Sequence, residues 1–116
     1  MGPRLVRDVP PSVRVLICNP TACDHYLSRW VEAWLGESVL VSKCYSQTPD
    51  VVEPYLKLGL AAIVVFSLEG VSDIVARVTS VSRTPPPVVI VGAFGQKEAR
   101  DRLRRAVADC KTRQGE

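Results

Sequence analysis

The sequence predicts a single α/β domain of three layers, in which a four-stranded parallel sheet lies between two layers of helices. Strand-like and helix-like segments alternate four times along the chain, and its 116 residues suit one domain but not two. The strand-like segments are apolar at almost every position, which is typical of parallel strands that helices cover on both faces. Right-handed crossovers between these units give the expected strand order 2-1-3-4.

Four apolar runs bounded by turn residues predict the strands, at residues 13–18, 38–45, 60–66 and 88–91. The third run, LAAIVVF, is continuously apolar and rich in β-branched residues, which favours a strand buried on both faces. The expected organisation is an extended N-terminal arm at 1–11, the α/β domain at 12–111 and a frayed tail at 112–116.

Capping and stop signals place helices after the strands. Asp24 is expected to cap the first helix, and Gly36 to stop it. Pro54 interrupts the second, which Gly59 ends, so that helix should be short or bent. The expected helices start near residues 24, 48, 72 and 96, and the last of them runs to about residue 111.

Composition excludes several classes of protein. A hydrophobic fraction of 47% and a charged fraction of 23% are globular values, which exclude a disordered or low-complexity chain. The longest apolar run is far shorter than the roughly 20 residues that cross a bilayer, and the first residues lack the apolar core of a signal peptide. We therefore expect an intracellular protein, cytoplasmic or nuclear, without membrane association.

The loops that follow the strands are the expected binding positions, because ligands of such sheets bind at the carboxyl ends of the strands. The loop after the first strand lacks the Gly-x-Gly-x-x-Gly pattern of a dinucleotide site. The glycine-rich loop after the fourth strand suits either an anion or, more simply, a tight turn into the last helix. The candidate residues of these loops are Asn19, Thr21, Asp24, Ser67, Gly92 and Gly95.

Neither a metal nor another cofactor is expected. The four cysteines form no Cys-x-x-Cys pair, and His25 is the only histidine. Cys18, at the end of the first strand, is the one candidate nucleophile, as in a small enzyme or a phosphocysteine carrier. Low-molecular-weight phosphatases follow that cysteine with an Arg that holds phosphate, whereas Asp24 stands six residues after Cys18 and would repel it.

Two helical surfaces are candidates for partner binding. The net charge of +3 combines an acidic middle of the chain with a basic end, and the basic excess lies largely on the last helix. Helical spacing places Lys97, Arg100, Arg104 and Lys111 on one flank of that helix, with Arg105 elsewhere on its exposed side. On the first helix, Trp30 and Trp34 fall on an apolar face with Tyr26, for which core packing and protein docking are both open.

The stretch VRVLICNPTACDHYLSRWVEAWL resembles the opening of anticodon-binding-like domains, which occur in class II aminoacyl-tRNA synthetases and, in divergent form, in nuclear receptor coactivator 5. The matching positions are Asn19, Asp24 and Tyr26. This resemblance implies RNA or protein binding without catalysis. The layout is also flavodoxin-like and similar to that of receiver domains, but the carboxylate pair that accepts a phosphoryl group there is missing.

The sequence therefore predicts a non-catalytic binding module for another protein or for RNA, which uses the Arg-rich last helix and the aromatic first helix. A homodimer is possible. The alternatives are a degenerate receiver-like domain that docks or dimerises without phosphoryl transfer, and a small enzyme or phosphocarrier with Cys18 as nucleophile.

Overall fold

The computed structural model describes residues 13–18, 25–92 and 94–115. The predicted arm at 1–11 and three of the candidate loop residues, Asn19, Thr21 and Asp24, lie outside the described residues. Within the described parts of the chain, no helix combines the length and the apolar character that crossing a membrane requires.

The described strands form one parallel sheet, as the sequence predicts. The strands are β1 (Val13–Cys18), β2 (Val39–Cys44), β3 (Leu60–Val65) and β4 (Val88–Ile90). Their order across the sheet is β2-β1-β3-β4, and each neighbouring pair is parallel. The predicted order 2-1-3-4 is thereby confirmed, and every residue of β3 is buried, as its unbroken apolar run predicts.

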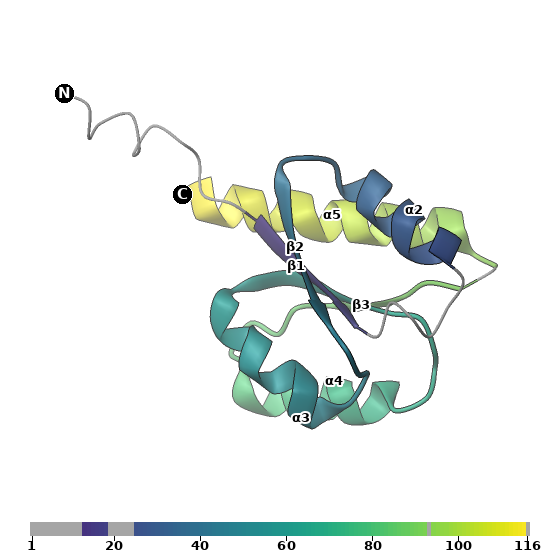
Figure 1. Cartoon of the computed structure of the whole chain (residues 1–116). Coiled ribbons are helices and arrows are strands. Elements are labelled where there is room, and N and C mark those ends of the chain that lie inside the picture. Colours follow the sequence, from purple (N-terminus) through teal and green to yellow (C-terminus); the bar gives the residue numbers. More distant parts are fainter. Residues whose placement is uncertain (1–12, 19–24, 93, 116) are drawn as a thin grey trace.

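Helices cover both faces of the sheet, which confirms the three-layer arrangement. Helices α2 (His25–Leu35) and α5 (Gln96–Gly115) lie on one face, and α3 (Pro49–Val52) and α4 (Val71–Val81) lie on the other (Figure 1). The 3₁₀ helix η2 (Glu53–Leu58) follows α3 directly.

Two apolar cores, one on each side of the sheet, hold the layers together. Alternate residues of β1 serve both, because successive side chains of a strand point to opposite faces. Val15 and Ile17 pack in the core with α2 and α5, whereas Leu16 and Cys18 pack in the core with α3 and α4.

Prolines and glycines set several element ends as predicted. Pro54 has no N–H for an α-helical hydrogen bond, and the chain changes from α3 to the 3₁₀ helix η2 one residue before it. Gly59 ends η2 with φ +72°, a left-handed conformation that favours glycine.

The C-terminal end of the fold differs from the prediction. Helix α5 continues to Gly115, four residues beyond its predicted end near residue 111. Nothing in the sequence breaks this helix before Gly115, and the hydroxyl of Thr112 donates to the carbonyl of Ala108 at 3.0 Å within the helix.

Candidate functional site

Three described loops leave the carboxyl edge of the sheet. They follow β2 (residues 45–48), β3 (residues 66–70) and β4 (residues 91–92 and 94–95). Because all strands run parallel, these loops lie at the same edge. The structure places Ser67, Gly92 and Gly95 in them, as predicted.

The side chain of Gln47 joins the first two of these loops. Its amide nitrogen donates to the carbonyl oxygens of Ser67 at 2.7 Å and Glu69 at 2.9 Å. Its amide oxygen accepts from the backbone N–H of Phe66 at 3.2 Å. One side chain thus holds the start of the β3–α4 loop against the β2–α3 loop, although about twenty residues separate them in the sequence. We call this arrangement the Gln47 clamp.

A pocket of about 520 Å³ lies between these two loops and the start of α4. Most of its lining residues are polar, but much of their hydrogen-bonding capacity is already used. The hydroxyl of Ser67 accepts from the backbone N–H of Glu69 at 3.1 Å, and Ser46 donates to Thr48 at 3.4 Å. The pocket is lined by Ser46, Gln47, Thr48, Pro49, Ser67, Glu69, Gly70 and Asp73.

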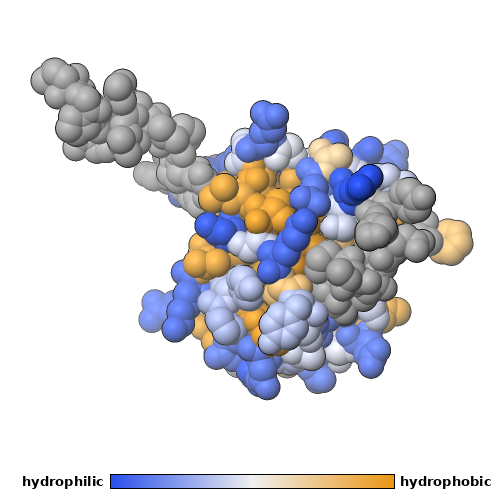
Figure 2. All heavy atoms as spheres, in the orientation of Figure 1, coloured by the Kyte–Doolittle hydropathy of each residue, from blue (hydrophilic) through white to orange (hydrophobic). Residues whose placement is uncertain are grey.

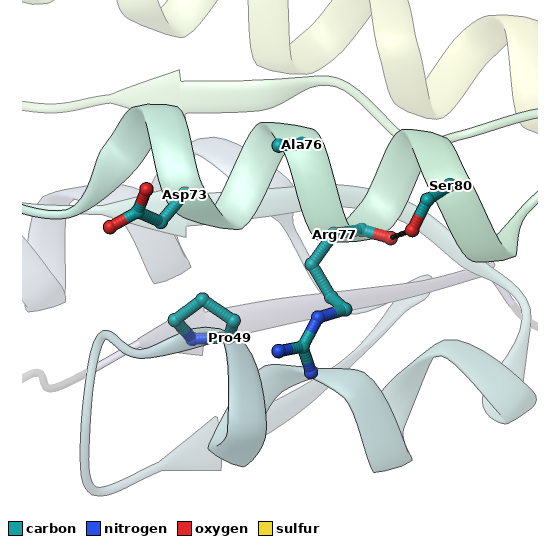
Figure 3. Close-up of a pocket in the computed structure, with 5 residues that line it drawn as sticks. All are labelled: Pro49, Asp73, Ala76, Arg77 and Ser80. Carbon is teal, nitrogen blue, oxygen red and sulfur yellow. Dashed lines mark hydrogen bonds between the residues drawn. The ribbon is translucent and has the colours of Figure 1, made fainter.

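A shallower groove of about 450 Å³ continues along α4 (Figure 3). Arg77 points from α4 toward α3 and η2, where its guanidinium contacts Glu53 of η2 at 2.7 Å and Asp50 of α3 at 3.1 Å. Hydrogen bonds to Glu53 and then to Asp50 raise the pKa of Arg77. This cation therefore links α4 to both α3 and η2 and is not available for an anionic ligand in the groove.

The three strand-end loops also carry exposed apolar side chains. The three most exposed large hydrophobic side chains of the described residues are Phe94 at 94%, Tyr45 at 82% and Leu68 at 76%. Each comes from a different loop, and the Gln47 clamp joins the loops of Tyr45 and Leu68. These residues were not among the predicted site residues, although each is a large apolar residue in a loop that follows an apolar strand.

A second exposed apolar region lies over the edge strand β2 (Figure 2). Leu40 of this strand is 44% exposed. The open edge is partly blocked, because the hydroxyl of Tyr55 donates to the carbonyl of Lys43 at 3.4 Å and the Lys43 side chain pairs with Glu32. A charged residue and a covered carbonyl are common devices against strand pairing between molecules.

The predicted basic flank of α5 lies along the seam with α2. Arg104 donates from Nε to the carbonyl of Trp34 at 3.3 Å, and the Lys111 ammonium donates to the hydroxyl of Ser38 at 2.9 Å. Arg100 Nε lies 3.5 Å from Asp101 Oδ1, an ion pair without hydrogen-bond geometry. Much of this flank therefore holds two elements together. Two predicted site residues, Lys97 and Arg105, are exposed.

The two tryptophans of α2 have different environments. Trp34 is half-buried and packs against the core, whereas Trp30 is 41% exposed. The residues that face the sheet most directly are Val31 and Leu35, which places Trp30 toward the side of the helix. Core packing thus accounts for Trp34 but leaves part of Trp30 at the surface.

Cys18 lies in a poor setting for a nucleophile. It is fully buried, and a hydrogen bond to Cys44 together with burial raises its pKa above the ordinary range of a thiol. Thiols that attack a substrate from solution need a lowered pKa and access to that substrate. Within the described residues, no group of three or more His, Cys, Asp or Glu side chains is arranged to hold a metal ion.

The first side chain of α5 contacts the glycine-rich loop before it. The amide nitrogen of Gln96 donates to the carbonyl of Gly92 at 3.2 Å. Gly95 has φ +71°, and its carbonyl accepts the N–H of Ala99 in the first turn of α5. These features match the tight turn that was one of the two sequence-based interpretations.

Comparison of the chain with protein-family models, with curated proteins and with solved structures finds no match.

Proposed function

We propose that this domain is a non-catalytic module that docks another protein through the carboxyl edge of its sheet. The observation that carries the proposal is the position of Phe94, Tyr45 and Leu68. These most exposed large apolar side chains lie on three loops at one edge. Side chains of this kind anchor protein interfaces when they enter a pocket of the partner, and aromatic residues dominate such sites.

The Gln47 clamp supports the same proposal, because it orders two of the three loops before a partner binds. A pre-ordered loop loses less conformational entropy on binding than a free one. Full burial of one large apolar side chain contributes about 1.5–3 kcal/mol, so the loss of Phe94 should weaken docking by roughly tenfold to a hundredfold.

Site-specific photo-crosslinking tests the proposal. A photoactivatable phenylalanine analogue placed at Phe94 or at Leu68 should form crosslinks to a discrete partner protein in cells. The same analogue at the exposed α5 positions Arg102 and Arg105 is the matched control and should not. Phe94→Ser should then weaken binding of the purified partner. Equal crosslinking from both sets of positions, or none from the edge, would contradict the proposal.

Homodimerisation through the same edge is one form of this docking. Sedimentation of the purified domain at increasing concentration distinguishes it from docking to a different protein. A second copy as partner predicts a rise in mass that Phe94→Ser suppresses.

RNA binding is the second candidate, because Arg102, Arg105 and Arg113 of α5 are exposed. Binding of single-stranded RNA at low salt should then fall steeply as salt increases. It should be lost in the double variant Arg102→Glu, Arg105→Glu, which spares the structural Arg104. If RNA binding depends on salt and on these two arginines in this way, and Phe94→Ser does not change it, RNA binding is the function and protein docking is not.

A further inference from the structure

Two cysteines lie side by side at the carboxyl ends of β1 and β2. Cys18 is paired in register with Cys44, and each is the last residue of its strand. Neighbouring strands lie about 4.8 Å apart, which falls within the Cα separation of about 4.4–6.8 Å that a disulfide bridges. Both side chains belong to the core that α3 and α4 cover. Both are present as free thiols.

The two thiols interact with each other. Cys18 is hydrogen-bonded to Cys44, and this contact is the largest cause of the raised pKa of Cys18. Cys44 in turn donates from Sγ to the carbonyl of Ser46 at 3.2 Å. The two side chains therefore lie in the same buried core, from register partners on neighbouring strands.

The two positions differ in access. Cys18 belongs to β1, which has a strand on each side, and it is fully buried. Cys44 ends the edge strand β2, is 4% exposed and precedes Tyr45, which is 82% exposed. The end of an edge strand opens locally at lower free energy than a central strand. A small neutral oxidant should thus reach Cys44 first.

We propose that Cys18 and Cys44 are a redox modification site, at which a hydroperoxide converts the two thiols into a cross-strand disulfide. In the first step the Cys44 sulfur attacks the peroxide, the O–O bond breaks, and Cys44 becomes a sulfenic acid while the peroxide leaves as water or an alcohol. In the second step the Cys18 sulfur attacks the Cys44 sulfur and gives up its proton. The sulfenic hydroxyl leaves with that proton as water.

The disulfide would act on the neighbouring loop. It removes the hydrogen bond from Cys44 to the carbonyl of Ser46, the residue before Gln47. Gln47 follows Ser46 directly in the chain. Loss of the hydrogen bond to Ser46 therefore changes how the loop that carries Tyr45 and Gln47 is held. This inference is independent of the docking proposal, because formation of the disulfide is measured without any partner.

Peptide mapping of the intact protein tests the proposal. The reduced chain is treated with hydrogen peroxide, remaining thiols are alkylated, and a tryptic digest is analysed by mass spectrometry. The expected product is a peptide linked through Cys18 and Cys44, with an intact mass lower by two hydrogens. Cys18 and Cys23 share the tryptic peptide 15–29, so the variant Cys23→Ser assigns the linkage and should retain it.

Cys110 supplies the matched control, because it is also buried and free but lies on α5. Cys110→Ser should retain the linkage, whereas Cys18→Ala and Cys44→Ala should each abolish it. If either alanine variant folds poorly, the peptide mapping of the chain with its native sequence still tests the proposal. A linkage that contains Cys23 or Cys110, or oxidation of Cys44 to a sulfinic acid without any link to Cys18, would overturn the proposal.

Discussion

Replacement of Leu103 by alanine is expected to lower the free energy of unfolding by about 2–5 kcal/mol, the range for large-to-small changes in a packed core. Leu103 is fully buried and belongs to the core on the α2 and α5 side of the sheet. The loss combines the removed apolar surface with the cavity that remains, because neighbours such as Val31 relax only in part. Urea denaturation with an unchanged slope measures this difference.

Arg105→Ala on the same helix is the matched control. Arg105 is exposed and two residues from Leu103, and alanine favours a helix as strongly as arginine does. A change within about 0.5 kcal/mol is expected there. Similar losses for the two variants would show that α5 is not packed on the sheet through Leu103.

The layers of this fold could be predicted because they depend on patterns within short segments. The run at 60–66 is apolar throughout, and only a strand with helices on both faces buries such a run completely. Pro54 and Gly59 likewise act on the local backbone, so the positions of their effects were correctly predicted.

The spacing of the charged residues on α5 predicted which side of the helix they share. It did not predict which residues that side of the helix contacts. Arg104 and Lys111 lie on one side of the helix as expected, yet their hydrogen-bond partners come from Trp34 and Ser38. Those partners are about seventy residues away in the sequence. The orientation of Trp30 was undetermined for a related reason, since a large aromatic residue suits either the core or the margin of an amphipathic helix.

The Gln47 clamp had no signal in the sequence. A glutamine in a polar loop is compatible with full exposure, and nothing local relates it to Ser67 or Glu69. Its hydrogen bonds arise because β2 and β3 run parallel on either side of β1, which brings their following loops together. Phe94, Tyr45 and Leu68 can each be recognised in the sequence as apolar residues in a loop. That they share one edge of the sheet follows only from the parallel arrangement of the strands.

Replacement of Gln47 by methionine is expected to destabilise the domain by roughly 1–3 kcal/mol, from three hydrogen bonds of about 0.5–1.5 kcal/mol each in a partly exposed setting. The direct readout is hydrogen exchange at the backbone N–H of Phe66, which donates to the Gln47 amide oxygen. Its exchange should accelerate more than that of residues in β3. Docking of a partner through Leu68 should weaken as well, because the loop loses its attachment.

Gln47→Glu separates the donor from the acceptor half of the clamp. The introduced carboxylate still accepts from Phe66 but faces the carbonyl oxygens of Ser67 and Glu69, where the amide nitrogen was the donor. The loss of stability of this variant relative to the native chain should become smaller below about pH 4, because the protonated carboxyl group can again donate a hydrogen bond. Ser46→Ala is the control, since the hydrogen bond from the Ser46 hydroxyl to Thr48 is long and exposed. If Gln47→Met leaves both stability and the exchange of the Phe66 N–H unchanged, the clamp does not hold the two loops.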